Sequence, residues 1–189
     1  MNKQVKSRQR VSDHGEVFTA EREVKAMCDL VADECTRVDS RFLEPACGEG
    51  NFLLEILSRK LMAIEDIEDS QDYQRDSLLA LSSLYGIDIL PDNVQICRNK
   101  LFDLWNNDSF TDELRNSART ILNLNIICGD SLEYKDYAGN PITFAEWTFN
   151  DDKVARKDFE FHNLVEDAIH FPVKEYPAIE YWRLYEYDR

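Results

Sequence analysis

Three acidic residues each close a short apolar run of the sequence, and carboxylates in such positions are candidates for ligand binding. They are Glu44, Asp88 and Asp130. The runs before them are too short for helices and have the composition of strands. If these strands are parallel, their carboxyl ends lie along one edge of the sheet, where ligands bind in open α/β sheets. Carboxylates at that edge would accept hydrogen bonds from ammonium, hydroxyl and amino groups.

A glycine-containing turn follows the first of these acids. Gly48 and Gly50 allow the backbone to approach a ligand closely, and a helix starting at Asn51 would direct free N–H groups toward an anionic group. The turn is not a dinucleotide-binding loop, because Leu53 stands where G-x-G-x-x-G needs its third glycine, and the chain has no G-K-[ST] phosphate loop. Three acids and one glycine turn suit a cationic nucleoside with an ammonium, a ribose diol, an adenine amino group and a carboxylate. S-adenosylmethionine carries all four groups.

Alternating strands and helices must position these residues. Apolar periodicity predicts helices at 21–35, 51–64, 91–104 and 111–119, and strands at 41–44, 85–89 and 124–128. This alternation is typical of βαβ units, so we expect an α/β, Rossmann-like fold with a mostly parallel sheet and flanking helices.

The pattern changes after Asp130. A turn at 137–142 is followed by a β-type segment at 143–149, a strongly charged segment at 151–160 and an aromatic tail at 176–187. Since no fourth strand-and-helix unit is visible, the sheet is expected to be incomplete and to end in an irregular, aromatic-rich C-terminal extension.

The run Leu43-Glu44-Pro45-Ala46-Cys47-Gly48-Glu49-Gly50-Asn51-Phe52 resembles the cofactor-binding motif I of bacterial N6-adenine DNA methyltransferases of restriction-modification systems. Gly15 to Ala20 is similar to motif X of that family, Tyr85 to Ile89 to motif II, and Cys128 to Ser131 to motif III. The resemblance implies the fold of S-adenosylmethionine-dependent methyltransferases over residues 15–135. A mobile basic N-terminus at 1–14 would precede this domain, and the extension at 136–189 would pack on it.

The resemblance also implies a role for each motif residue. Phe18 and Thr19 would border the methionine end of S-adenosylmethionine, and Glu44, Ala46 and Gly48 would hold its amino-acid moiety, with Cys47, Gly50 and Asn51 completing the motif. Asp88 would take the ribose hydroxyls, Ile89 would pack on the adenine, and Asp130 would bind the adenine amino group. The alternative for each acid taken alone is a solvated loop carboxylate.

The sequence differs from the family at the catalytic motif IV, [DNS]-P-P-[YF]. Its nearest equivalent here is Asn140-Pro141-Ile142, which keeps the N-P pair and lacks the second proline and the aromatic residue. Asn140 and Pro141 are the candidate catalytic residues, whose oxygens would accept hydrogen bonds from the target amino group. The alternative is a plain N-P turn.

Two functions from different classes therefore remain open. The first is an adenine-specific DNA methyltransferase, or a cofactor-binding part of one, in a restriction-modification or related defence system. The second is a catalytically inactive, methyltransferase-like binding or interaction module. Methylation of a small molecule, an RNA or a protein is a weaker third hypothesis, because the motif I form and the motif X position resemble the DNA group.

The net charge of the chain limits how it could bind DNA. The net charge is −15 and the sequence pI is about 4.6, which argues against a free-standing nucleic-acid binder. We therefore expect DNA contact only with a partner, such as a second methyltransferase subunit or a specificity subunit. A homodimer through the aromatic C-terminus is a further expectation.

The remaining composition bears on location. No stretch is apolar enough to span a membrane, and the first ten residues are polar and basic without an apolar segment behind them, so a cytoplasmic protein is expected. The five cysteines form no C-x-x-C pair, which favours reduced thiols over disulfides or a metal site.

Overall fold

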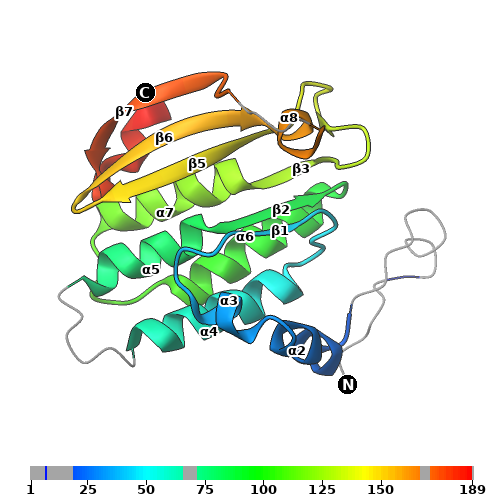
Figure 1. The fold of residues 1–189 in the computed structure, drawn as a ribbon, viewed down its shortest axis with the longest axis horizontal. Coiled ribbons are helices and arrows are strands. Elements are labelled where there is room, and N and C mark those ends of the chain that lie inside the picture. Colours follow the sequence, from blue (N-terminus) through cyan, green and yellow to red (C-terminus); the bar gives the residue numbers. More distant parts are fainter. Residues whose placement is uncertain (1–6, 8–18, 66–71, 167–170, 189) are drawn as a thin grey trace.

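The computed structural model describes residues 7, 19–65, 72–166 and 171–188 and is an α/β fold (Figure 1). Its first sheet has the strand order β1 (Phe42–Glu44), β2 (Leu84–Asp88), β3 (Ile126–Asp130) and β4 (Lys135–Asp136). The first three strands are parallel, and β4 runs antiparallel to β3. The predicted α/β class and mostly parallel sheet with flanking helices are therefore confirmed, and the three acids do end neighbouring parallel strands.

Helices precede and follow these strands. α4 (Asn51–Glu65) and α6 (Pro91–Trp105) follow β1 and β2, while α5 (Tyr73–Ser82) and α7 (Asp112–Asn125) lead directly into β2 and β3. α2 (Glu21–Asp29) and α3 (Ala32–Thr36) pack against α4. Each long helix buries one apolar stripe at helical spacing, for example Leu53, Ile56, Leu57, Leu61 and Ile64 of α4.

Two predicted helix boundaries were wrong. The single helix expected at 21–35 is two helices, because the chain leaves helical torsions at Val31, where φ is −129° and ψ is 39°. The helix expected at 111–119 continues to Asn125. Thr111 starts it as predicted, since its hydroxyl accepts a hydrogen bond from the Leu114 N–H (3.2 Å), and buried apolar residues on one face extend it.

The C-terminal third forms a second, antiparallel sheet rather than the irregular extension that we expected. β5 (Thr143–Asn150), β6 (Lys153–Glu160) and β7 (Lys174–Glu180) pair in that order, α8 (Phe161–Glu166) follows β6, and the 3₁₀ helix η1 (Tyr181–Asp188) ends the described chain. The charged segment becomes a strand because alternate side chains are buried: Val154, Arg156 and Asp158. Arg156 and Asp158 neutralise each other through two contacts, of 2.7 and 2.9 Å.

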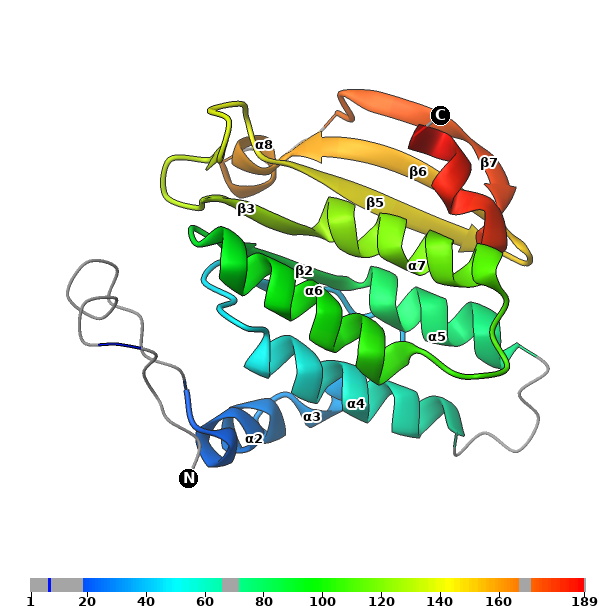
Figure 2. The ribbon, with the colours of Figure 1, turned by 180° about the vertical axis from the view of Figure 1, so that it is seen from behind.

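The two sheets share a buried interface through β2. Leu84 belongs to the core formed with the helices, whereas Tyr85 and Ile87 pack with Phe144 and Phe161 of the C-terminal part. The Tyr85 hydroxyl donates to the backbone oxygen of Ala145 (3.0 Å). Figure 2 shows α4, α5, α6 and α7 below the second sheet, with η1 beside α7.

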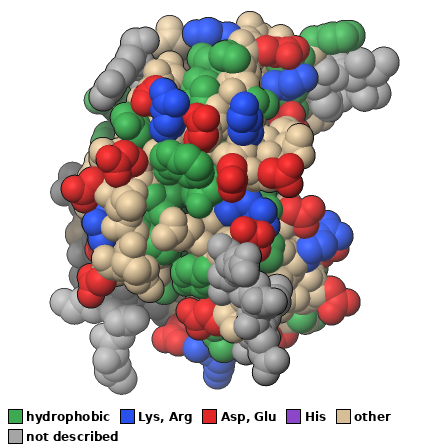
Figure 3. Space-filling view, turned by 90° about the vertical axis from the view of Figure 1, so that its left-hand side faces the viewer, with side chains coloured by type: hydrophobic (Ala, Val, Ile, Leu, Met, Phe, Trp, Pro, Cys, Tyr) green, Lys and Arg blue, Asp and Glu red, His purple; other side chains and the backbone are tan. Residues whose placement is uncertain are grey.

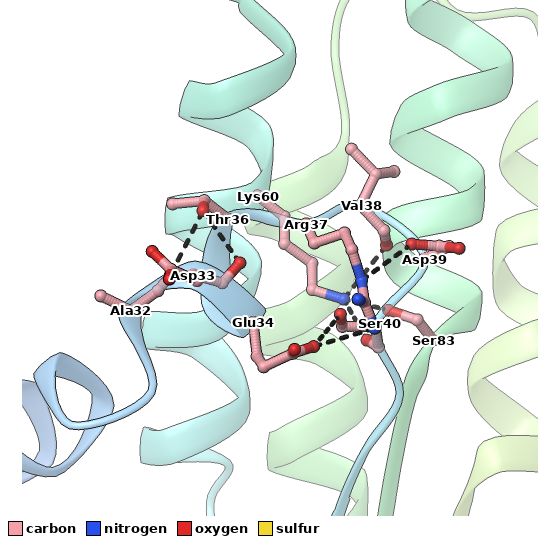
Figure 4. A network of polar contacts seen from close by, with 10 residues as sticks. All are labelled: Ala32, Asp33, Glu34, Thr36, Arg37, Val38, Asp39, Ser40, Lys60 and Ser83. Carbon is pink, nitrogen blue, oxygen red and sulfur yellow. Dashed lines mark hydrogen bonds and ion pairs between the residues drawn. The ribbon is translucent and has the colours of Figure 1, made fainter.

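A buried lysine fixes the segment that leads into β1 (Figure 4). Lys60 of α4 is fully buried, and its Nζ donates to the backbone oxygens of Val38 (3.1 Å) and Ser40 and to the Ser83 hydroxyl (2.6 Å). These bonds join α4, the approach to β1 and the residue before β2. Burial lowers the pKa of Lys60 to about 8.

None of the helices in the described ranges is long and apolar enough to cross a membrane.

Candidate functional site

The carboxyl ends of β1, β2 and β3 open into one cavity of about 560 Å³. This volume lies within the usual range of small-molecule sites. Most of the predicted cofactor-binding residues line it: Thr19, Glu44, Ala46, Cys47, Gly48, Asn51, Asp88, Ile89 and Asp130. Gly50 is buried and is not among the lining residues, and Phe18 lies outside the described residues. The structure therefore brings together residues from four separate parts of the sequence.

The turn at 45–50 depends on its two glycines. Gly48 and Gly50 have φ values of 53° and 89°, which side chains rarely adopt. A Cβ on Gly50 would lie 2.6 Å from the Sγ of Cys97 in α6. Because both positions are glycine, the turn can pack closely on α6 while its backbone faces the cavity.

Asp88 connects this turn to the end of β2. Its Oδ2 accepts from the Gly48 N–H (2.9 Å), and its Oδ1 accepts from the Leu90 N–H (2.8 Å) and from the Asn93 side-chain amide (3.2 Å). A carboxylate has about four acceptor sites, so Asp88 can accept further bonds from a ligand.

Glu44 and Asp130 retain even more accepting capacity. Glu44 Oε1 accepts a long bond (3.3 Å) from the Ala46 N–H, and Asp130 Oδ1 accepts from the backbone N–H groups of Leu132 (2.8 Å) and Glu133 (3.3 Å). Asp130 Oδ2 has no hydrogen-bond partner among the described residues. These local bonds hold both carboxylates in place at the cavity.

The cavity is electronegative. Glu44, Asp88 and Asp130 line it, and no lysine, arginine or histidine of the described chain does so. The neighbouring Glu49 forms an ion pair with Lys100 (2.7 Å). Such a site attracts cationic ligands and repels phosphates. Among the described residues no three His, Cys, Asp or Glu side chains are close enough to hold a metal ion.

Apolar side chains line the same cavity, and sequence reasoning missed most of them. Ile89, which is half exposed, was predicted, whereas Leu90 and Leu132 were not. Leu132 is 86% exposed, and an apolar side chain so exposed has no role in the core. The other unpredicted lining residues are Pro45, Phe52, Asn93, Gly129 and Ser131. Pro45, Gly129 and Ser131 were open to sequence reasoning because they are next to Glu44 or Asp130 in the sequence, whereas Phe52 and Asn93 lie in the helices that follow.

Cys47 is a packing residue in this turn rather than a nucleophile. A hydrogen bond with Cys97, together with burial, raises the pKa of Cys47 far above its usual value, so its thiol stays protonated. Asn51 has a positional role, since its side-chain amide donates to the backbone oxygen of Thr19 (3.2 Å). This bond joins the segment before α2 to the start of α4.

The candidate catalytic residues lie outside the cavity. The Asn140 backbone N–H and side-chain amide donate to the two oxygens of Asp136 (2.8 and 3.2 Å), and both Asn140 and Pro141 are exposed. Gly139, with φ of 87°, completes the turn. The structure does not bring Asn140 and Pro141 together with the cofactor-binding candidates. The two residues form a plain N-P turn, which was the alternative interpretation.

Comparisons with known proteins identify no relative. No family model, no curated protein and no solved structure matches this chain. The functional proposal therefore depends on the chemistry of the cavity and on the motif resemblance.

Proposed function

We propose that the chain binds S-adenosylmethionine at the carboxyl ends of β1, β2 and β3, as the cofactor-binding part of an adenine-specific DNA methyltransferase. The observation that carries the proposal is a cavity with three carboxylates, a glycine turn and no basic side chain from the described residues. A cation that also presents hydroxyl and amino groups complements this set of acceptors.

The residues present fit this cofactor. Glu44 would accept from its ammonium group, Asp88 from the ribose hydroxyls, and the Oδ2 of Asp130 from the adenine amino group. Ile89 and Leu132 offer apolar surface for the adenine ring, and the backbone of the glycine turn would face the carboxylate. When bound, S-adenosylmethionine supplies an electrophilic methyl group on a sulfonium.

Methyl transfer to adenine requires acceptor residues beyond those that line the cavity, and we propose that a partner polypeptide supplies them. The target amino group needs acceptors beside the cofactor, and Asn140 is bonded within its own turn. DNA binding needs a basic surface, whereas the chain carries a net charge of −15. Figure 3 shows one face on which acidic and basic side chains are interspersed around hydrophobic ones. A second methyltransferase subunit or a specificity subunit in a restriction-modification or related defence system would supply both the acceptors for the target amino group and the basic surface for DNA.

A methyltransferase-like interaction module without catalytic activity is the second candidate. The position of Asn140 outside the cavity favours it. Labelled methyl transfer to adenine-containing DNA, with and without co-expressed partner subunits, separates the two candidates. Transfer only in the presence of a partner supports the first, and cofactor binding without transfer in any combination supports the second.

Titration calorimetry with S-adenosylmethionine tests the site itself. We expect Asp88→Asn to weaken binding by about tenfold to a hundredfold, because the ribose hydroxyls lose a charged acceptor. Asp103→Asn, at an exposed position on α6, is the matched control and should leave the affinity unchanged. Circular dichroism of both variants verifies their folding. No binding by the wild-type chain at millimolar cofactor, or equal affinity in Asp88→Asn, would overturn the proposal.

A further inference from the structure

A second cavity of about 460 Å³ shares no lining residue with the candidate site and is lined by residues of β1, β2, β5, β6 and α8. We call it the apolar groove. Its lining includes Leu43, Tyr85, Phe144, Phe159, Leu164 and Val165. The floor is buried and closely packed, since the Tyr85 and Phe144 rings pack edge to face with centroids 5.3 Å apart.

The rim of the groove leaves apolar side chains in water. Leu43 is 43% exposed, Leu164 39% and Val165 55%. Contiguous exposed apolar surface of this kind marks interaction sites in soluble proteins. The charged residues of the lining, Arg41 and Glu146, form an ion pair with each other (2.6 Å), so the groove itself carries no net charge.

An open strand edge borders the groove, and it restricts what can bind there. β1 pairs with β2 on one side, and no described strand pairs with its other side. The Phe42 N–H donates to the Ser83 backbone oxygen of the β2 side, so by alternation the backbone N–H and C=O of Leu43 point away from β2. Another extended backbone satisfies this donor and this acceptor and at the same time places alternate side chains in the groove.

We propose that the β1 edge and the apolar groove bind an extended segment of a partner polypeptide, which adds a strand to the first sheet. The segment carries apolar side chains at alternate positions, which enter the groove. Lysine or arginine residues flank them, because the net charge of −15 on this chain attracts a basic partner. The added strand lies beside Glu44, the last residue of β1, and so next to the candidate site. Strand addition itself requires no cofactor.

Selection from a random displayed peptide library tests this surface without cofactor. We expect the enriched peptides to have alternating apolar residues and a net positive charge. The best peptide is then synthesised with a fluorescent label, and its affinity is measured by anisotropy. Hydrogen exchange in the same complex reports on the backbone: the Leu43 amide should exchange at least about tenfold more slowly when the peptide is bound.

Two variant pairs separate backbone pairing from groove packing. Leu43→Pro removes the outward N–H, and Leu43→Val is its control because it keeps that donor. Val165→Asp puts a charge on the groove rim, and Val31→Asp makes the same change at a similarly exposed position (47%) remote from the groove. Leu43→Pro and Val165→Asp should each weaken peptide binding by at least about tenfold, whereas the two controls should bind like the wild type.

The proposal is overturned if no peptide is enriched, or if enriched peptides bind Leu43→Pro as tightly as they bind Leu43→Val. Helix-forming peptides that leave the Leu43 amide unprotected would also overturn it, because the groove would then accept a helix. Thermal unfolding of each variant distinguishes lost binding from lost folding, and Val165→Asp remains informative if Leu43→Pro does not fold.

Discussion

Asp88 is the residue that connects the candidate site to the fold. Its carboxylate holds the glycine turn through Gly48 and the start of α6 through Leu90 and Asn93. Sequence reasoning selected it because it ends an apolar strand, and carboxyl ends of parallel strands share one edge of a sheet. That argument located Glu44, Asp88 and Asp130 correctly at one cavity. It could not foresee that Asn140 is bonded to Asp136, since a local turn is decided by hydrogen bonds rather than by periodicity.

Lys60 yields a prediction at the same scale. Its pKa is lowered to about 8 in the folded protein from 10.5, so the unfolded chain binds more protons between these values and stability rises with pH across this window. Relative to Lys60→Met, the wild type should gain up to about 3 kcal/mol in free energy of unfolding between pH 7 and pH 10.5, because each tenfold difference in proton affinity contributes about 1.4 kcal/mol. Asp39, Cys35, Arg37 and Glu34 also act electrostatically on Lys60, and because all four are present in both proteins the difference reports only the contribution that depends on Lys60.

Denaturant titrations of both proteins at a series of pH values measure this difference. Parallel stability curves for the wild type and Lys60→Met would show that Lys60 titrates near its normal value.

At the scale of elements, the glycine turn explains how the loop between β1 and α4 packs closely against α6. Gly48 and Gly50 were predicted from the resemblance, and the structure supplies the physical reason at Gly50: a positive φ and no room for a Cβ beside Cys97. Strand and helix types were predictable because each has its own hydrophobic period. The exact ends of helices were not, because a single residue such as Val31 can leave helical torsions without interrupting the apolar period of the sequence.

Gly50→Ala and Gly139→Ala form a matched pair that separates strain from steric clash. Both glycines have φ near 90°, but a Cβ on Gly139 meets nothing within 4 Å. We expect Gly139→Ala to cost about 1 kcal/mol of stability and Gly50→Ala about 3 kcal/mol, because the second also overpacks α6. Chemical denaturation measures both. In a Cys97→Ala background the cost of Gly50→Ala should fall toward that of Gly139→Ala, and an undiminished cost would contradict the clash with Cys97.

At the scale of the whole molecule, the C-terminal third completes the core. η1 lies beside α7, where the Leu184 N–H donates to the Ser117 hydroxyl (3.0 Å) and the Leu184 side chain is fully buried. The Tyr187 hydroxyl donates to the Val154 backbone oxygen (2.9 Å). These aromatic and apolar residues therefore pack within the chain, and a homodimer through them stays a prediction.

Leu184→Ala tests this closure. It should lower the free energy of unfolding by about 2–5 kcal/mol, because it leaves a cavity between η1 and α7. Met62→Ala, at a position 62% exposed on α4, should change stability by less than about 0.5 kcal/mol. Thermal and denaturant unfolding provide both values, and equal small losses would mean that η1 contributes little to the fold.

Net charge gives a second prediction at this scale. Because the chain carries −15, it should not retain duplex DNA on its own at about 0.15 M salt. A gel-shift or anisotropy titration measures this. Salt-dependent retention by the isolated chain would contradict the expectation that a partner supplies the DNA contacts.

The sequence by itself determined the α/β class, the parallel order of the first three strands and the acids at their ends. These follow from hydrophobic period and from short local motifs, which are properties of neighbouring residues. Only the tertiary structure decided that the C-terminal third pairs as an antiparallel sheet, that Asn140 stays outside the cavity and that the β1 edge is left open by the described strands. The pairing of strands and the position of a turn relative to a cavity depend on how whole segments of the chain meet in space, and the free energy of those contacts is not recorded in any local pattern.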